Sequence, residues 1–225
     1  MLYKIKYFFI IILIIASNLA NAQKQEDLQL WANFGLSKEI KDFEFTYEQE
    51  LRLFQNISEV EMYFSDFGIS YSLNKHVDFK TNYRIKKSHT DIDLYEYSHR
   101  FNYDIKLSEK KKRFKFSYKI RFQTQIDNFL YINKTDFFES KLRNKFKCSY
   151  NLRHTKIEPF GSMEFFNDAN TYRLEFSKIR LTAGVSYSKK KIGKISVFYR
   201  IEKQLQTDIP KNDYIIGTSY SFNLK

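Results

Sequence analysis

The sequence predicts an all-β fold, a transmembrane antiparallel β-barrel of ten or twelve strands. Three observations lead to this prediction. Apolar and polar residues alternate with period two along almost the whole chain, an export signal precedes them, and short and long polar connections follow one another in turn.

The stretch RFKFSYKIRFQTQI, from Arg113 to Ile126, shows the alternation without a fault. Its even-numbered residues are aromatic, aliphatic or threonine, and its odd-numbered residues are basic or polar. Because successive side chains of a strand point to opposite faces, this strand has one apolar face and one basic face. No comparable stretch of the mature chain has helical periodicity, which indicates an all-β protein.

Eleven segments carry the pattern, at 28–37, 43–54, 61–73, 77–87, 94–107, 113–126, 137–152, 156–166, 172–187, 192–204 and 213–224. Bacterial single-chain barrels have even strand numbers, so we expect ten or twelve. The segment from Leu28 to Ser37 is the weakest, because the short turn after it would start the mature chain on the wrong side of the membrane.

The phase of the alternation slips at two places. Met62 and Phe64 share a parity that the apolar residues from Phe67 onward do not, and Phe176 is out of step with Ile179. An inserted residue is what a β-bulge supplies, so bulges are expected near 65–66 and 177–178, with a tight turn as the alternative.

An export signal opens the chain. Lys4 and Lys6 precede an apolar run from Tyr7 to Ala16, and Ala20-Asn21-Ala22 forms a small-x-small cleavage site. We therefore expect a signal peptide over 1–22 and one barrel domain over 23–225; the alternative, a membrane anchor, needs roughly 20 apolar residues.

Composition narrows the class of protein and of partner further. Cys148 is the only cysteine, so no intramolecular disulfide can form, and the mean hydropathy is -0.54. The formal net charge of +12 falls by two, to +10, when Lys4 and Lys6 leave with the signal. Export and the spread of basic residues over many strands argue against nucleic acid as a partner. Lipid phosphates, an anionic solute or acidic partners inside the fold fit better.

The connections also sort by length. Short ones fall near 38–42, 74–76, 108–112, 153–155 and 188–191, and longer ones near 55–59, 88–93, 128–136, 167–171 and 206–212. Outer-membrane barrels have short periplasmic turns and longer external loops, whereas a soluble sandwich has no reason to sort its loops.

Residue size indicates which face of the strands points outward and which points into the barrel. Aromatic residues make up 18% of the chain and dominate the apolar face. The interior of a small barrel has little room for so many rings, whereas lipid accommodates them. The rings are therefore expected outside and the charges inside; a soluble periplasmic lipocalin-like barrel with the reverse orientation is the alternative.

The polar face then lines a lumen, with acids on the early strands and bases on the central ones. The candidate lumen charges are Glu48, Glu50, Arg52, Arg84, Arg100, Lys119, Arg121, Arg143, Glu164 and Arg200. Buried charges are tolerated when paired, so we expect a narrow or closed lumen crossed by ion pairs, whose cationic surplus favours anions. Charges that merely coat a wet lumen are the alternative.

Other chemistry is weakly indicated. The sequence contains no phosphate loop, nucleophile elbow or metal-spaced Cys/His cluster. His99 lies mid-strand on the apolar parity, which Ser140 shares on another strand, and a lipid-facing Ser/His pair of a hydrolase is one interpretation of them. A tolerated interface histidine is the simpler interpretation. Trp31, the only tryptophan, is interpreted as an interfacial anchor.

Several stretches carry a resemblance to a known family. The chain contains, in this order, Trp31 followed by a short strand, FEFTYEQELRLF with Glu50 and Arg52, EPFGSMEFFND, and YRLEFSKIRLTAGVSY leading to SVFYRIEKQ. Together they resemble the outer-membrane barrel family catalogued as domain of unknown function 2490. The resemblance implies a barrel in the outer membrane of a Gram-negative bacterium, and no assigned activity or site residues.

The expected function is a structural or narrow, anion-leaning channel barrel, and not an enzyme. A loop-mediated binding barrel and a lipid-modifying enzyme are the alternatives. The expected partners are outer-membrane lipid and, during insertion, the barrel assembly machinery, because the ending YSFNLK resembles its aromatic-alternating signal with Lys225 in place of the terminal aromatic. The sequence indicates no cofactor, metal or small-molecule ligand.

Overall fold

A computed structural model describes residues 25–90, 94–127, 139–169, 175–189, 192–207 and 210–224. Within these ranges the regular structure is entirely β, which confirms the all-β prediction. The strands are β1 (Gln25–Ile40), β2 (Phe43–Phe54), β3 (Glu59–Ser72), β4 (Val77–His89), β5 (Tyr95–Lys111), β6 (Phe114–Asp127), β7 (Glu139–Tyr150), β8 (Ile157–Asp168), β9 (Phe176–Lys189), β10 (Gly193–Gln204) and β11 (Lys211–Leu224). The signal peptide expected over 1–22 lies outside the described residues.

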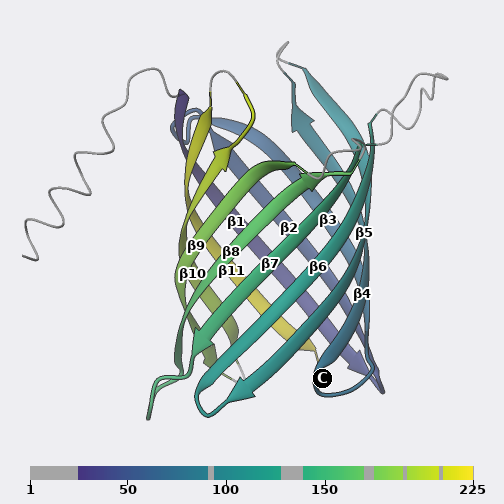
Figure 1. Cartoon of the computed structure of the whole chain (residues 1–225), viewed down its shortest axis with the longest axis vertical. Coiled ribbons are helices and arrows are strands. Elements are labelled where there is room, and N and C mark those ends of the chain that lie inside the picture. Colours follow the sequence, from purple (N-terminus) through teal and green to yellow (C-terminus); the bar gives the residue numbers. More distant parts are fainter. Residues whose placement is uncertain are drawn as a thin grey trace, which may run out of the picture.

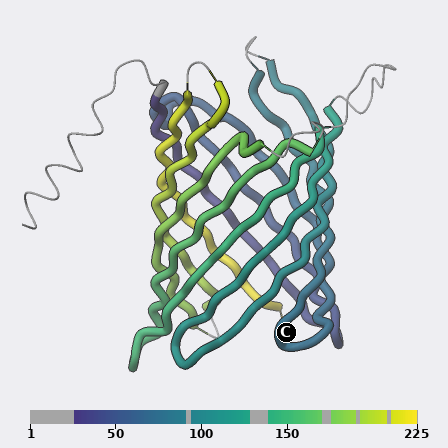
Figure 2. The backbone as a smooth tube through the Cα atoms, viewed as in Figure 1, coloured from purple at the N-terminus to yellow at the C-terminus, as the bar shows by residue number. Residues whose placement is uncertain are grey.

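The strands form a closed barrel in which each pairs with its neighbours in the chain. Every consecutive pair is antiparallel, and the strands are steeply tilted against the barrel axis (Figure 1). The purple first strand and the yellow last strand lie side by side (Figure 2), where β1 and β11 pair in parallel from Gln25↔Lys211 to Lys38↔Leu224. No helix in the described ranges is long and apolar enough to cross a membrane.

The expected count of ten or twelve strands is wrong, because the described chain contains eleven. The segment considered weakest, 28–37, is the middle of β1, one of the longer strands. An odd number of strands in an up-and-down meander brings the first and last strands together in the same direction. The barrel therefore closes through a parallel ladder, which satisfies the backbone groups of both edges. The stacked rings of Phe34 and Tyr220, 5.9 Å apart, pack on this seam.

A cross-link tests the parallel closure. Ala32 and Thr218 are exposed partners in the β1–β11 register. Neighbouring strands bring Cα atoms within disulfide range, so the variant Ala32→Cys/Thr218→Cys, made with Cys148→Ser, is expected to form a disulfide in the folded protein. Mass spectrometry of the oxidised protein would identify the cross-linked peptides.

The matched control moves one cysteine four residues along β11, as Ala32→Cys/Tyr214→Cys. Four residues span about 13 Å of strand, which is beyond disulfide reach. A cross-link in the control but not in the test pair, in folded protein, would contradict the parallel register and the eleven-stranded closure.

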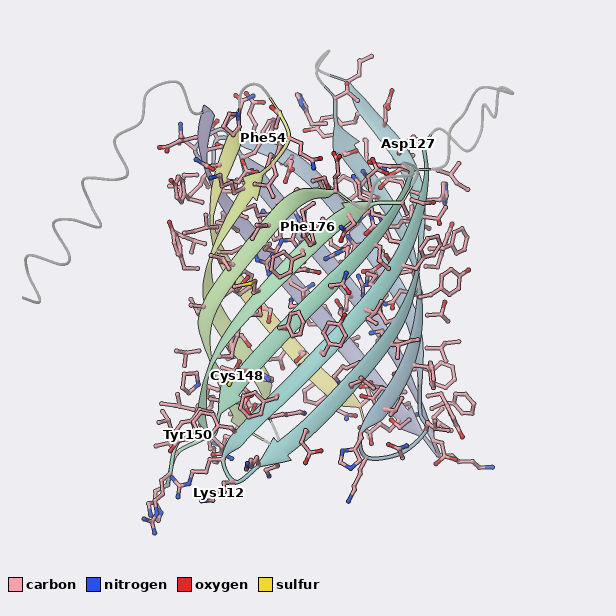
Figure 3. The ribbon with its side chains drawn as sticks, viewed as in Figure 1. Phe54, Lys112, Asp127, Cys148, Tyr150 and Phe176 are labelled. Atoms are coloured by element: carbon pink, nitrogen blue, oxygen red, sulfur yellow. The ribbon has the colours of Figure 1, made fainter. Side chains whose placement is uncertain are left out.

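Side chains alternate across the wall as the sequence predicts, with rings projecting outward (Figure 3). Exposed large side chains include Phe45, Phe67, Tyr103, Phe122 and Val197. The buried set is mostly polar or charged, and among the described residues its large hydrophobic members are Trp31, Phe64, Phe166 and Ile215. The interior is therefore an ionic layer and the exterior an apolar one.

One expected bulge is confirmed and the other is misplaced. The β8–β9 register shifts where Asn167 pairs with Phe176, which leaves Ser177 as the extra residue near the expected position. The β2–β3 register instead shifts at Glu61, and β3 continues regularly through residues 65–66. The parity slip there has another cause: Phe64 points inward and is 3% exposed.

The connections gather at the two ends of the barrel as their order requires. Lys112 and Tyr150 lie at the end with the short turns, and Phe54 and Asp127 lie at the opposite end (Figure 3). Much of the longer connections, at 91–93, 128–138, 170–174 and 208–209, lies outside the described residues, as does 190–191 in a short one.

Candidate functional site

The lumen contains a cavity of about 720 Å3 to which all eleven strands contribute. Its lining extends from Ser72 and Asp78, beside the short turn between β3 and β4, to Gln204 and Lys211 at the opposite end. A second cavity of about 490 Å3 at the short-turn end shares Asp78 and Lys106 with it. Polar space therefore continues through most of the barrel's length.

The lining of the larger cavity is cationic. Fourteen lysines and arginines face nine aspartates and glutamates. Seven of the chain's ten arginines belong to it: Arg52, Arg84, Arg100, Arg121, Arg143, Arg180 and Arg200. Cation surplus in a confined polar space raises the local concentration of anions.

The two signs of charge lie on different parts of the wall. β2 and β3 carry five of the acids (Glu44, Glu48, Glu50, Glu61 and Asp66), whereas β5 to β9 carry nine of the bases (Arg100, Lys106, Lys119, Arg121, Lys141, Arg143, Lys145, Lys178 and Arg180). In an eleven-stranded ring β2 and β3 stand opposite β7 and β8. An electric field therefore crosses the lumen from the basic wall to the acidic wall.

The structure places nine of the ten predicted lumen charges in the cavity lining: Glu48, Glu50, Arg52, Arg84, Arg100, Lys119, Arg121, Arg143 and Arg200. The tenth, Glu164, is 2% exposed and lies beneath the cations that contact it.

Glu164 is the centre of the largest ion-pair network. Its Oε1 lies 2.7 Å from Nη2 of Arg143, and its Oε2 lies 3.3 Å from Nη1 of Arg180 and 3.9 Å from Nζ of Lys145. Arg180 also bridges to Glu202, with Nε 2.6 Å from Oε1. One buried carboxylate thus compensates cations from β7 and β9, and Arg180 links the network to β10.

Other ion pairs connect neighbouring strands between β3 and β6. Arg84 donates to both carboxylate oxygens of Asp66, with Nε 3.0 Å from Oδ1. Arg121 binds Asp104 in the same two-pronged manner, at 2.6 and 2.7 Å, and Lys119 lies 3.5 Å from that carboxylate. The two parallel hydrogen bonds of each Arg–Asp pair fix the plane of the guanidinium group as well as the position of its charge.

Aromatic rings inside the lumen stack against the arginines, and this corrects the interpretation of Trp31 as an interfacial anchor. Trp31 is 4% exposed inside the barrel, and its indole Nε1 donates to Oε1 of Gln29 at 3.0 Å. The Arg52 guanidinium lies 3.5 Å from the Trp31 ring centroid and that of Arg200 lies 4.7 Å from it. The cause is parity: Trp31 occupies an inward position of β1, where its ring makes cation–π contacts with arginines and does not face the exterior.

Two phenylalanines have the same role. The Phe64 ring lies 3.4 Å from the Arg84 guanidinium, and the Phe166 ring lies 4.6 Å from that of Arg143 and 4.8 Å from that of Arg180. These rings hold the arginine head groups in place from one face.

Sequence reasoning missed Asp66, Arg180 and Glu202. The erroneous bulge at 65–66 hid Asp66, whose parity matches that of inward Phe64 in a regular strand. Arg180 lies between Ile179 and Leu181, so the alternation of β9 was sufficient to place it inside. Glu202 alternates with Ile201 in the same way.

The Ser/His hypothesis is not supported by the geometry. His99 lies on β5 with Nδ1 2.6 Å from the Tyr83 hydroxyl, and Ser140 lies on β7 with its hydroxyl 3.2 Å from that of Thr124. Because β6 separates the two strands, the two side chains are not adjacent. Across the described ranges, no group of three or more His, Cys, Asp and Glu residues is arranged to hold a metal ion.

Comparison with known proteins gives one family. A family model described as "Protein of unknown function (DUF2490)" matches residues 28–213. This match confirms the resemblance to domain of unknown function 2490, and its description names no location or activity. A search of curated proteins gave no match.

Proposed function

The chain belongs to the DUF2490 family, and we propose that it is an outer-membrane β-barrel that forms a narrow channel favouring anions. The observation that carries the proposal is the lumen cavity, whose lining has fourteen cations against nine carboxylates and which, with the second cavity at the short-turn end, takes up most of the barrel's length. Neither the ion pairs nor the stacked rings alone would require a conducting role.

The exterior supports the membrane location. Exposed aromatic and aliphatic side chains cover the wall on every strand, from Phe34 on β1 to Ile216 on β11. A monomer in water rarely exposes apolar patches of more than a few hundred Å2, whereas lipid covers such a surface at no cost. A soluble lipocalin-like barrel needs these rings at its centre.

The proposed outer-membrane location determines which end of the barrel faces the periplasm. The export signal predicted over 1–22 would deliver the chain to the periplasm, and the barrel assembly machinery would insert it with outer-membrane lipid around it. The short turns at Lys41, Lys112 and 151–156 would then face the periplasm, and the longer connections would face the outside.

Ion selectivity tests the channel. Protein purified in detergent and shown to be folded by its heat-dependent gel mobility is added to a planar bilayer with a KCl gradient. The reversal potential is expected to have the sign that indicates a preference for chloride over potassium, because the surplus cations of the lining attract chloride into the lumen. A preference for potassium, or no conductance from inserted and folded protein, would refute the proposal.

A further inference from the structure

Like charges meet directly across several strand pairs that line the lumen. Arg84 pairs with Arg100 between β4 and β5, and Arg121 pairs with Arg143 between β6 and β7. Directly opposed like charges destabilise a sheet, so each pair needs compensation. Carboxylates supply it for three of the four arginines: Arg84 binds Asp66, Arg121 binds Asp104 and Arg143 binds Glu164.

Arg100 is the exception. No carboxylate of the described residues lies within ion-pair distance of it, and its Nε donates instead to the neutral Oε1 of Gln125 at 3.0 Å. Gln125 is 6% exposed, and its amide donates to Asp127 at 2.8 Å, which fixes the amide in place. The guanidinium is therefore held rigidly without being neutralised.

The charged groups around Arg100 are mostly positive. Arg84, Arg143 and Arg52 act on it most strongly, and the carboxylate of Glu139 opposes them with a smaller effect. All three are fixed, because each has a carboxylate partner and an aromatic ring against its guanidinium: Phe64 for Arg84, Phe166 for Arg143 and Trp31 for Arg52. All four guanidinium groups line the lumen cavity.

We propose that this arginine cluster, Arg100 with Arg52, Arg84 and Arg143, binds an oxyanion, a small carboxylate or phosphate, inside the lumen; its role in transport rests on the proposed channel. An anion of this class supplies the negative charge that Arg100 lacks, and its paired oxygens fit the planar fork of a guanidinium. The cavity of about 720 Å3 is within the range of small-molecule sites.

Trp31 provides a direct readout of the site. It is the chain's only tryptophan, and its ring lies 3.5 Å from Arg52 of the cluster. Inorganic phosphate is titrated into the folded full-length protein in detergent at constant ionic strength set by KCl, with tryptophan fluorescence and calorimetry as readouts. Acetate replaces phosphate in a second titration, which distinguishes the two sources of the oxyanion.

The expected result is saturable binding of phosphate or acetate that chloride does not reproduce. Arg100→Gln removes the uncompensated charge together with its charge-assisted hydrogen bonds, and is expected to weaken binding about tenfold or more. Arg100→Lys keeps the charge without the fork and is expected to bind with intermediate strength. The control Arg153→Gln, in the exposed turn before β8, makes the same charge change outside the lumen and is expected to bind as the wild type does.

Three outcomes would overturn the inference: no saturable response from folded wild-type protein, the same response to chloride, or unchanged affinity in folded Arg100→Gln. The bilayer experiment keeps this separate from the channel proposal. Binding without conductance rejects the channel and leaves the site, whereas anion-selective conductance without saturable binding rejects the site and leaves the channel.

Discussion

Replacement of Glu164 by glutamine is expected to lower the free energy of unfolding by about 3–5 kcal/mol. The carboxylate is 2% exposed and compensates Arg143, Arg180 and Lys145. Glutamine has nearly the same shape but no charge, so three cations from β7 and β9 would lose their shared counter-charge. Removing one partner of a buried ion pair is costly because the remaining charge stays desolvated.

Urea titration of the detergent-folded protein measures this change in the free energy of unfolding. Heat-dependent gel mobility reports the folded fraction at each urea concentration. The matched control is Glu109→Gln. Its carboxylate lies 2.8 Å from Nδ1 of His76, but the two side chains are 65% and 45% exposed. An exposed pair contributes at most about 1 kcal/mol. Equal effects of the two substitutions would show that the Glu164 network is not desolvated as described.

Reversal of lumen charge is expected to reverse the ion preference of the proposed channel. The triple variant Lys80→Glu, Lys106→Glu and Lys141→Glu changes fourteen cations and nine carboxylates in the lining to eleven and twelve. The reversal potential should therefore move from the chloride side of zero to the potassium side, since the sign of the lining charge sets which ion enters. These lysines are 24–39% exposed, so substitution leaves the buried arginine network in place.

The control makes the same charge change outside the lumen, at the exposed residues Lys111, Lys189 and Lys203. It is expected to retain the chloride preference. A triple lumen variant that folds, conducts and still prefers chloride would refute the assignment of selectivity to these side chains. A shift of equal size in the control would attribute selectivity to the surface charge at the barrel's ends.

The sequence by itself determined the class of fold and the two faces of its wall. The period-two pattern in stretches such as Arg113 to Ile126 depends only on backbone geometry, which sends neighbouring side chains to opposite sides. For the same reason nine of the ten predicted lumen charges line the cavity. Size and polarity of the side chains then indicated which face is inside.

Only the tertiary structure decided how the barrel closes and which charges meet. The parallel pairing of β1 with β11, which runs to Lys38 and Leu224, joins the first and last strands of the described chain, and no turn motif encodes a contact between residues so far apart in sequence. The sequence does not place the rings of Trp31 and Phe64, because an aromatic ring packs either on an apolar exterior or against an arginine guanidinium inside. The arginines that these two rings contact lie on other strands. Among the described residues Arg100 has no carboxylate within ion-pair distance, and this too cannot be read from its own strand, because it depends on where the carboxylates of other strands lie.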